Sequence, residues 1–400
     1  KIVAASADAD GKITGFYTSL NAALAAVTDD NQTTVVLRDV TENLTSILRG
    51  NIVGDATITL TNSDWVYCPY TFVIGKGITL KVPALFYYAG GSVIRGTVVA
   101  DAYYQRYAGT KLYIEGTMTV NSETFILRYT DGDPNAGIYV NGGTLNASVI
   151  YFYQGVISAT NGTINVGTYW QTNETDGQGS ANLVLDNSTL TVSVYDHPAK
   201  ATGNSTVTFK NGSTMDCRNG GFTYGDNALI SVDSTSSIIG KGNEVVKPHV
   251  AKIGTKGYET LRAAIDAAQD GDTVTLLQSV TLSEILVIDK AIILDGNDKT
   301  LTSTAARAIN VSGANGAVIK NLTIVASGER AINIIQNATN VTIDNVTATS
   351  ANYTVNLAGS AANAVVVVNN STLNGLCTVN VAAAGAEVTI AGSTINCNDN

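Results

Sequence analysis

The sequence is short of the residue types that build metal and redox sites. Its 400 residues include only two His, two Met and four Cys. The cysteines form no CxxC pair and have no metal-ligand spacing: Cys68, Cys217, Cys377 and Cys397. We therefore predict no metal and no cofactor, and we favour free, buried thiols over a disulfide, because free Cys packs as a small apolar residue.

Charge is also scarce, at 14% of residues, and the net charge is −10. An acidic chain lacks the basic patch that nucleic acids and anionic membrane surfaces require. It also disfavours a polyanion such as pectate, unless a cation bridges the two. No apolar run reaches about 18 residues, so we expect no membrane span. The chain starts at Lys1, and we expect processing or truncation to have removed any export signal.

What the sequence does contain is a phrase that returns four times in its last 150 residues. It reads Arg-Ala-Ile-Asn-Val at 307–311 and recurs at 330–334, 353–357 and 377–381. Its asparagines lie 23, 23 and 24 residues apart: Asn310, Asn333, Asn356 and Asn380. A fixed period of this length, built from β-forming residues, is typical of a solenoid of stacked coils. Parallel pairing would stack the four Asn side chains into a hydrogen-bonded ladder.

Two segments predict short amphipathic helices at the start of two domains. Leu20, Ala23, Leu24 and Val27 follow helical spacing, and so do Leu261, Ala264, Ile265 and Ala268, 241 residues later. A β-run follows each, at 34–37 and at 273–277. Each helix would cover the open end of a coil stack. We therefore predict a first domain at 1–243 and a second at 244–400.

Apolar residues mark the coils in both domains. In the second domain they recur every 22 to 25 residues: Leu301, Ile324, Ala348, Leu373 and Ile395. In the first they recur every 18 to 27 residues: Leu60, Leu80, Val98, Met118, Leu145, Ile164, Leu190, Met215 and Ile238. The wider range indicates corner loops of varying length. Cys377 and Cys397 are 20 residues apart, nearly one coil, so a disulfide between them stays an alternative to free thiols.

The helix motif, the Gly-Asp-Thr-Val-Thr-Leu run at 271–276 and the Asn-x-Thr coils resemble the right-handed parallel β-helix, or pectate-lyase-like, superfamily. The nearest likeness is to large bacterial cell-surface and adhesin-like proteins. The resemblance covers 258–400 well and 17–240 more loosely. It implies an all-β fold of two tandem right-handed parallel β-helices, but not an activity, since this solenoid serves enzymes, adhesins and stalks alike.

The sequence gives little support for catalysis. Lys320, Asp344, Asn369 and Ala391 would share one column, which supplies one acid without a partner. In the first domain, the segment from Arg128 to Asn135 and the segment from Asp196 to Lys200 combine acids with Arg, His or Lys. We interpret the former as an Asp-Gly, Asp-Pro turn and the latter as a solvated corner. No catalytic residues are predicted.

Tyrosine is concentrated in the first domain, where 15 of the 18 lie between Tyr67 and Tyr224. In the run 149–153, Ile150 and Phe152 share one face, which leaves Tyr151 and Tyr153 on the other. Exposed aromatic rings can bind sugar rings or a protein partner. The alternative is that Tyr columns only stabilise the sheet. The candidate ligand-binding residues are Tyr67, Tyr87, Tyr104, Tyr151, Tyr153, Tyr169 and Trp170.

The sequence therefore predicts a non-catalytic secreted or cell-surface protein that binds a glycan or a host or cell-surface protein through the first domain, with the second as a spacer. Two alternatives stay open: a polysaccharide lyase or glycoside hydrolase, and a purely structural surface repeat. A continuous exposed line of aromatic rings would favour binding. Burial of the rings would favour a scaffold.

Overall fold

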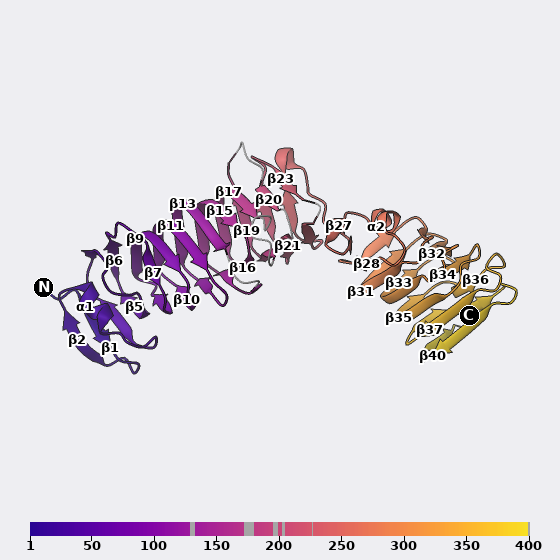
Figure 1. Cartoon of the computed structure of the whole chain (residues 1–400), viewed down its shortest axis with the longest axis horizontal. Helices are drawn as coiled ribbons and strands as arrows, with labels where there is room; N and C mark the ends of the chain where they lie inside the picture. Colours follow the sequence, from indigo (N-terminus) through magenta and orange to yellow (C-terminus); the bar gives the residue numbers. More distant parts are fainter. Residues whose placement is uncertain (129–132, 172–179, 195–198, 202–204, 226, 399–400) are drawn as a thin grey trace. The chain divides into compact units, whose positions relative to one another are not determined.

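The computed structural model describes residues 1–400 except 129–132, 172–179, 195–198, 202–204, 226 and 399–400, and except the side chains of 123–128 and 199–200. The described chain is all-β, and its coils stack into a β-solenoid (Figure 1). The predicted all-β solenoid fold is confirmed. The chain divides into two compact units, Lys1–Lys247 and Pro248–Asn400. The sequence-based boundary, at 243/244, lies a few residues earlier.

Unit 1 begins with a β-hairpin and a helix. Helix α1 (Leu20–Ala25) starts at Ser19, whose hydroxyl accepts the Ala22 N–H and caps the helix. Leu20, Ala23 and Leu24 are buried against the first strands. The Glu42 carboxylate accepts the N–H groups of Leu20 and Asn21 at the same helix end. Strand β1 of the hairpin pairs antiparallel with β3, the first strand of the stack.

Two sheets run along unit 1, and within each the strands of successive coils pair in parallel. The first sheet contains β1 (Ala4–Ala7), β2 (Ile13–Tyr17), β3 (Thr33–Val36), β5 (Gly50–Gly54), β8 (Phe72–Ile74), β10 (Gly90–Ile94), β12 (Lys111–Ile114), β14 (Gly137–Asn141), β16 (Gly155–Thr160), β18 (Ala181–Asp186), β21 (Ser205–Lys210) and β24 (Leu229–Val232). The second contains β4 (Val40–Glu42), β6 (Ala56–Leu60), β7 (Val66–Cys68), β9 (Ile78–Tyr87), β11 (Thr97–Arg106), β13 (Thr117–Arg128), β15 (Thr144–Phe152), β17 (Thr163–Gln171), β19 (Thr189–Val192), β20 (Ala199–Ala201), β22 (Thr214–Asp216), β23 (Phe222–Tyr224) and β25 (Ser237–Ile239). A single 3₁₀ turn, η1 (Lys241–Asn243), follows β25.

Unit 2 repeats this plan with different corners. Helix α2 (Leu261–Ala267) is capped by Thr260 and buries Leu261, Ala264 and Ile265. One sheet contains β26 (Ala251–Ile253), β27 (Lys256–Tyr258), β28 (Thr273–Leu276), β29 (Val280–Leu282), β31 (Ile293–Ser303), β33 (Val318–Ala326), β35 (Val341–Thr349), β37 (Val365–Asn369), β38 (Thr372–Gly375), β40 (Glu387–Ala391) and β41 (Thr394–Cys397). The other contains β30 (Leu286–Ile288), β32 (Arg307–Ser312), β34 (Arg330–Ile335), β36 (Tyr353–Leu357) and β39 (Val379–Val381).

The apolar columns read from the sequence lie in register, with one exception. In unit 2, Leu301, Ile324, Ala348, Leu373 and Ile395 are paired from coil to coil. In unit 1, the column from Leu80 to Ile238 is likewise paired throughout. The exception is Leu60, because the partner of Leu80 is Ile58.

The asparagines of the repeated phrase form a continuous chain of hydrogen bonds. Asn333 donates from Nδ2 to Oδ1 of Asn310 over 2.9 Å, Asn356 to Asn333 over 2.7 Å, and Asn380 to Asn356 over 2.6 Å. Asn333 and Asn356 are each 2% exposed. Another column of the same strands pairs Arg307 with Arg330 and Arg330 with Tyr353. The Arg330 guanidinium lies 5.7 Å from the centre of the Tyr353 ring.

The cysteines correct one expectation. Cys68 and Cys217 are buried free thiols, and burial raises the pKa of each to about 12. Cys377 and Cys397 likewise form no disulfide, but they are exposed rather than buried. Both lie in the last coil of unit 2, whose outer side is not covered by a further coil in the described residues.

Candidate functional site

A column of aromatic residues runs from coil to coil along the second sheet of unit 1. Parallel pairing places one residue from each of six strands, β7, β9, β11, β13, β15 and β17, in the same register: Tyr67, Phe86, Tyr104, Phe125, Tyr151 and Trp170. The side chain of Phe125 lies outside the described residues. We call the other five the outer aromatic column.

The rings of this column pack on one another and stay accessible to solvent. The ring centres of Tyr67 and Phe86 are 5.3 Å apart, those of Phe86 and Tyr104 4.9 Å, and those of Tyr151 and Trp170 5.7 Å. Tyr67 is 51% exposed and Trp170 is 40% exposed, while the other three are half-buried. Such geometry leaves ring faces and edges available to a ligand.

Three further rings widen the column at its β7 end. Trp65 lies 6.2 Å from Phe86 and 6.3 Å from Tyr104, centre to centre. Tyr88 lies 5.7 Å from Phe86 and 6.3 Å from Tyr107, which is 44% exposed. The aromatic surface therefore spreads over neighbouring strands rather than along a single line.

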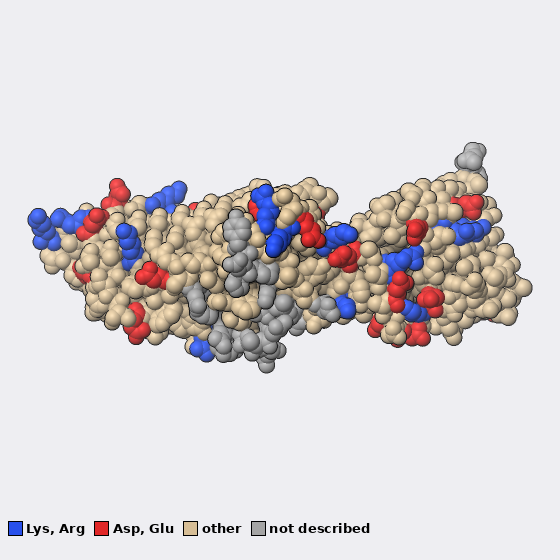
Figure 2. Space-filling view, turned by 90° about the horizontal axis from the view of Figure 1, so that it is seen from above, with Lys and Arg blue, Asp and Glu red and all other residues tan. Residues whose placement is uncertain are grey.

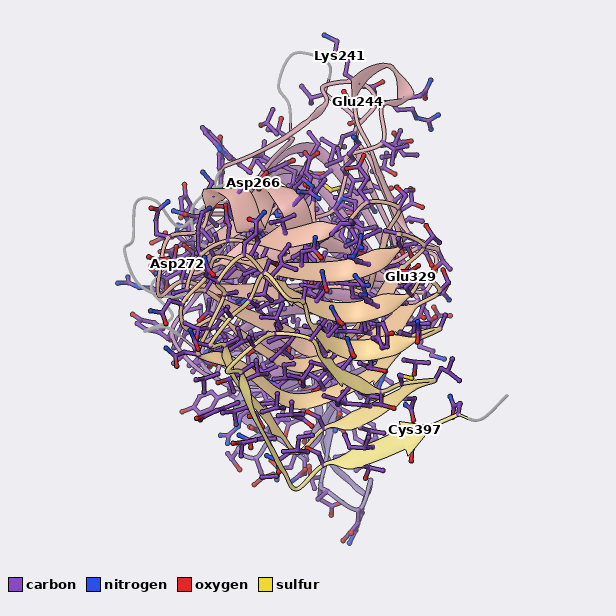
Figure 3. The ribbon with its side chains drawn as sticks, turned by 90° about the vertical axis from the view of Figure 1, so that its right-hand side faces the viewer. Lys241, Glu244, Asp266, Asp272, Glu329 and Cys397 are labelled. Atoms are coloured by element: carbon purple, nitrogen blue, oxygen red, sulfur yellow. The ribbon has the colours of Figure 1, made fainter. Side chains whose placement is uncertain are left out.

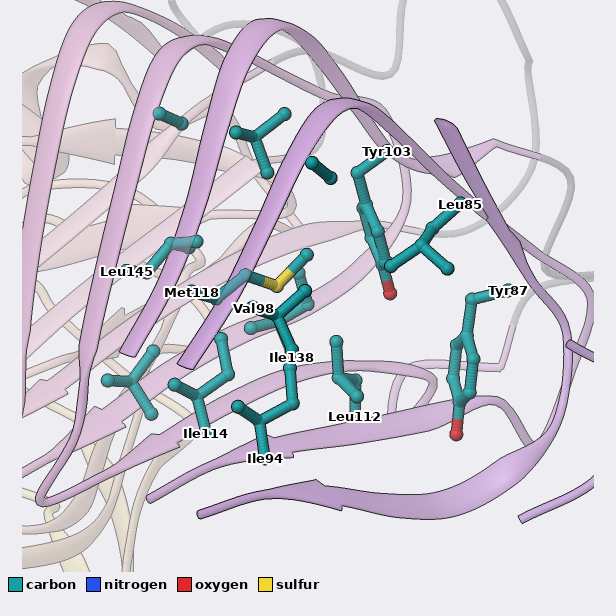
Figure 4. Close-up of a cluster of buried hydrophobic side chains, with 14 of the residues drawn as sticks. Leu85, Tyr87, Ile94, Val98, Tyr103, Leu112, Ile114, Met118, Ile138 and Leu145 are labelled. Carbon is teal, nitrogen blue, oxygen red and sulfur yellow. The ribbon is translucent and has the colours of Figure 1, made fainter. Parts of the chain in front are cut away.

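Two of the predicted ligand-binding residues, Tyr87 and Tyr169, are not on the surface. Each is 1% exposed and points into the solenoid, so the prediction that they face a ligand is wrong. The Tyr87 hydroxyl donates to the Lys111 carbonyl over 2.7 Å and accepts the Ser92 N–H over 3.1 Å. Burial raises the pKa of Tyr87 to about 12. Figure 4 shows Tyr87 and its neighbour Tyr103 among the aliphatic side chains of the core.

Phe86 faces outward in place of Tyr87 because the alternation of inward and outward residues changes along β9. In the first half of β9, Leu80 and Val82 are buried, but in the second half Leu85 and Tyr87 are buried. Pro83 and Ala84 both face partly outward between them, so the alternation shifts by one residue at this bend. An outward Phe86 follows from that shift. Ile150 and Phe152 point inward as predicted, with Tyr151 half-buried on the outer side. Tyr153 is half-buried just beyond the end of β15.

Two of the inner tyrosines, Tyr103 and Tyr169, are held by the same hydrogen-bond arrangement. The Tyr103 hydroxyl donates to Oε1 of Gln105 over 2.7 Å, and the Tyr169 hydroxyl donates to Oε1 of Gln171 over 2.8 Å. Each Gln then donates from Nε2 to backbone carbonyls of the facing sheet, such as Gly137 and Ala181. The same three-residue pattern, a Tyr, an aromatic residue and a Gln, therefore occurs at 103–105 and at 169–171. In each case the Tyr and the Gln are buried, and the aromatic residue between them faces outward. This signal was present in the sequence and identifies the outer position.

The bend in the long strands also forms a shallow groove beside the aromatic column. Its volume is about 480 Å³, and it is lined by residues of β13, β15 and β17 and by the two residues that follow β19: Thr119, Val120, Asn121, Asn146, Ala147, Ser148, Asn165, Val166, Gly167, Ser193 and Val194. Ser148 precedes Tyr151 by three residues on β15, and Gly167 precedes Trp170 by three on β17. No sequence pattern predicted this groove.

Hydrogen bonds between coils fix the polar side chains of the groove. Asn165 donates from Nδ2 to Oδ1 of Asn146 over 2.9 Å, and Asn146 donates to Oγ1 of Thr119 over 3.3 Å. The Ser148 hydroxyl donates to the Asn121 carbonyl over 2.6 Å. The groove therefore presents ordered amide and hydroxyl groups, which are uncharged, next to exposed rings. On the face shown in Figure 2, charged residues stand in small groups separated by uncharged surface.

The candidate catalytic segments lie mostly outside the described residues. This holds for Tyr129, Asp131, His197 and the side chains of Arg128 and Lys200. Asp133 is described, and its carboxylate accepts the N–H groups of Gly109 and Asn135, which lowers its pKa. That is a loop-stabilising role.

In unit 2, Lys320, Asp344, Asn369 and Ala391 are paired in one column as predicted. The column also begins with Asp295, whose carboxylate lies 3.4 Å from the Lys320 ammonium. Asp295 was not predicted from the sequence, because the three residues between Asp295 and Lys299 bulge out of the register. Within the described ranges, no group of three or more His, Cys, Asp or Glu could hold a metal ion.

Comparison with protein-family models, with curated proteins and with solved structures finds no match for this chain. Among the described residues, no helix has both the length and the apolar character needed to cross a membrane. The class that the fold defines is therefore a parallel β-solenoid.

Proposed function

We propose that the chain is a non-catalytic, secreted or cell-surface protein that binds a glycan through the outer aromatic column and groove of unit 1. The observation that carries the proposal is the in-register column itself, in which solvent-accessible rings repeat from strand to strand. Sugar rings pack their C–H faces on aromatic faces. A few fixed polar groups beside such an apolar surface are the usual arrangement of a small-molecule site.

The groove indicates the chemistry of the ligand. Its amide and hydroxyl groups, from Asn146, Asn165 and Ser148, match sugar hydroxyls as donors and acceptors. The whole chain carries a charge of −10, which disfavours a polyanionic glycan. A neutral polysaccharide is therefore the ligand that we propose. In this proposal unit 2 acts as a spacer, and the chain is a bacterial member of the pectate-lyase-like superfamily.

A protein partner is the second candidate, because exposed Tyr and Trp also favour protein interfaces. The spread of Trp65, Tyr88 and Tyr107 beside the column supplies a wider apolar surface than a single sugar chain needs. Binding to protein but not to glycan would select this candidate.

The test is a glycan array followed by calorimetry with the best neutral oligosaccharide. The Tyr151→Ala, Trp170→Ala double variant should lower affinity at least about tenfold, because stacking on each ring contributes on the order of 1 kcal/mol. The matched control is Tyr113→Ala, Tyr139→Ala. These two rings are also stacked, with centres 5.2 Å apart, but they belong to the first sheet of unit 1.

Three results would contradict the proposal. One is a parent protein that binds no glycan on the array. Another is release of reducing sugar or unsaturated product from a polysaccharide, which would favour the lyase or hydrolase alternative. The third is an equal loss of affinity in both double variants, which would place the ligand elsewhere. Circular dichroism of each variant establishes that the fold is retained.

A further inference from the structure

The five-stranded sheet of unit 2 carries charge of one sign only. Its strands β30, β32, β34, β36 and β39 contain two charged residues, Arg307 and Arg330, and no Asp or Glu. The whole chain, by contrast, has a net charge of −10. Both arginines lie on inner strands of the sheet, with a paired strand on each side, so their surroundings do not depend on either end of the stack.

The two arginines are neighbours in register. Parallel pairing places Arg307 of β32 beside Arg330 of β34, and Arg330 beside Tyr353 of β36. Neighbouring strands lie about 4.8 Å apart, so the two backbone positions are held one strand spacing from each other. Like charges directly opposite on a sheet destabilise it. Both side chains are half-buried, which weakens the screening of this repulsion by water and salt.

The chain supplies little negative charge to offset the repulsion. Within the described residues, the Arg307 guanidinium has neither an ion pair nor a hydrogen bond. Arg330 has Glu329, with 4.0 Å between Nη2 and Oε2, but the Glu329 side chain is 61% exposed. An exposed pair at this distance contributes little. Figure 3 shows Glu329 at the side of the coil stack.

Arg330 is also held in place without all its donors being used. Its guanidinium lies 5.7 Å from the centre of the Tyr353 ring, a cation–π contact that restricts the side chain. Its Nε is buried and has no hydrogen-bond partner in the described part of the chain. A buried donor left in this way is costly. The pair is therefore an ordered cationic group that the protein's own residues do not complete.

We propose that Arg307 and Arg330 form a site for a tetrahedral oxyanion, a phosphate or sulfate group, which bridges the two guanidinium groups. Arg and phosphate form bidentate hydrogen bonds. A carboxylate has two oxygens, which a single guanidinium satisfies, whereas a phosphate or sulfate group has at least three and bonds to both. A phosphate group also carries about −1.5 to −2 charges near pH 7, which offsets two positive charges. This site belongs to unit 2 and is independent of glycan binding by unit 1.

The test is calorimetry of the full chain with sodium phosphate and with sodium sulfate at low ionic strength. Arg307→Gln and Arg330→Gln should each lower the affinity at least about tenfold, because each removes charge-assisted hydrogen bonds. The matched control is Lys320→Gln, which removes the same charge from the other sheet of unit 2, where Asp295 lies 3.4 Å from the ammonium. Its affinity should stay within about twofold of the parent, as expected for a separate site.

Thermal unfolding separates binding from a purely structural role of the pair. Without phosphate, Arg307→Gln should unfold at the temperature of the parent or above it, because the repulsion is removed. With phosphate, the Tm of the parent should rise, since a ligand of the native state stabilises it, and the Tm of Arg307→Gln should not. Arg307→Lys keeps the charge without the fork of donors, and should bind phosphate with an affinity between those of the parent and Arg307→Gln.

Glucose 6-phosphate identifies the source of the group. Tighter binding than inorganic phosphate indicates a phosphate ester as the ligand, and weaker binding indicates the free ion. Neither heat nor a rise in Tm with phosphate or sulfate would overturn the proposal. Acetate that binds as tightly as phosphate would overturn the tetrahedral assignment, and an equal loss of affinity in Lys320→Gln would show general charge attraction instead of a site. The glycan measurements on unit 1 are unaffected by these outcomes, so the two proposals fail separately.

Discussion

The early coils of unit 1 and the coils of unit 2 turn in two chemically different ways. In unit 1 the turn links a strand of the first sheet to the next strand of the same coil, whereas in unit 2 it lies within β33 and β35 and between β37 and β38. In the early coils of unit 1 it is made by glycines that approach the carbonyl oxygens of the preceding coil. A Cβ on Gly96 would lie 2.2 Å from the Gly75 oxygen, and a Cβ on Gly116 would lie 2.1 Å from the Gly96 oxygen.

In unit 2 the turn is made by asparagines in the left-handed region. Asn321, Asn345 and Asn370 have φ angles of 50°, 52° and 50°, which Asn tolerates better than other non-Gly residues. Their side chains bond from coil to coil, as when Asn345 donates to Asn321 over 2.9 Å. A glycine turn has no side chain, whereas an asparagine turn has a side chain that bonds to the next coil. The asparagine turns leave a recurring residue in the sequence of unit 2, since Asn321, Asn345 and Asn370 lie 24 and 25 residues apart.

The largest expected effect is on the glycine corner. Gly116→Ala places a methyl group against the Gly96 and Arg95 carbonyl oxygens, 2.1 and 2.5 Å away. Backbone atoms cannot move aside as a flexible side chain can, so we expect a loss of about 3 kcal/mol in the free energy of unfolding, near the upper end for overpacking. Urea unfolding followed by circular dichroism measures it.

The control for this prediction is Gly240→Ala in the same unit, where the nearest atom to a new Cβ is the Glu244 oxygen at 3.5 Å. We expect its unfolding free energy to stay within about 0.5 kcal/mol of the parent. Equal stabilities for the two variants would show that the carbonyl column relaxes freely, and the close approach would then not explain these glycines.

A smaller loss is expected in the asparagine ladder of unit 2. Asn333→Ala removes both a donor to Asn310 and an acceptor for Asn356, which is itself 2% exposed. A buried amide left without its partner costs about 1–3 kcal/mol. Asn380→Ala, at the end of the ladder, removes one bond at a half-buried position and should cost about half as much. Thermal unfolding of the two variants checks the order, and a larger loss for Asn380→Ala would contradict it.

The repeated phrases were sufficient to predict the coil register of unit 2. Asn310, Asn333, Asn356 and Asn380 are each one coil apart, and a parallel stack with a constant coil length has one register. The helices were also readable, because Leu20, Ala23 and Leu24, and likewise Leu261, Ala264 and Ile265, recur at helical spacing and are buried. The register of the early coils of unit 1 was harder to predict, since glycine corners leave no side chain to recur. Leu60 was assigned to the apolar column, but Ile58, two residues earlier, occupies that position.

The candidate site was predicted only in part, for a reason that lies in backbone geometry. Alternation assigns faces along a straight strand, but β9 and its neighbours bend in the middle, and the bend changes which residues face outward. Tyr67, Tyr104, Tyr151 and Trp170 were placed on the outer face, whereas Tyr87 and Tyr169 are in the core. The groove at the bend has no sequence signature of its own, because Asn, Ser and Thr are common throughout the chain.

The smallest expected effect separates inner from outer tyrosines in unit 1. Tyr169→Phe removes the hydroxyl that donates to Gln171 within the core, and should cost about 1 kcal/mol of stability. Tyr67→Phe, at a position 51% exposed, should change stability by less than about 0.5 kcal/mol. Tyr169→Phe should leave glycan affinity unchanged, since a residue that is 1% exposed cannot touch a ligand. Urea unfolding and calorimetry measure the two quantities independently. A loss of affinity in Tyr169→Phe as large as that in Tyr151→Ala, Trp170→Ala would mean that the inner and outer columns act as one unit, and the separation between scaffold and binding surface would fail.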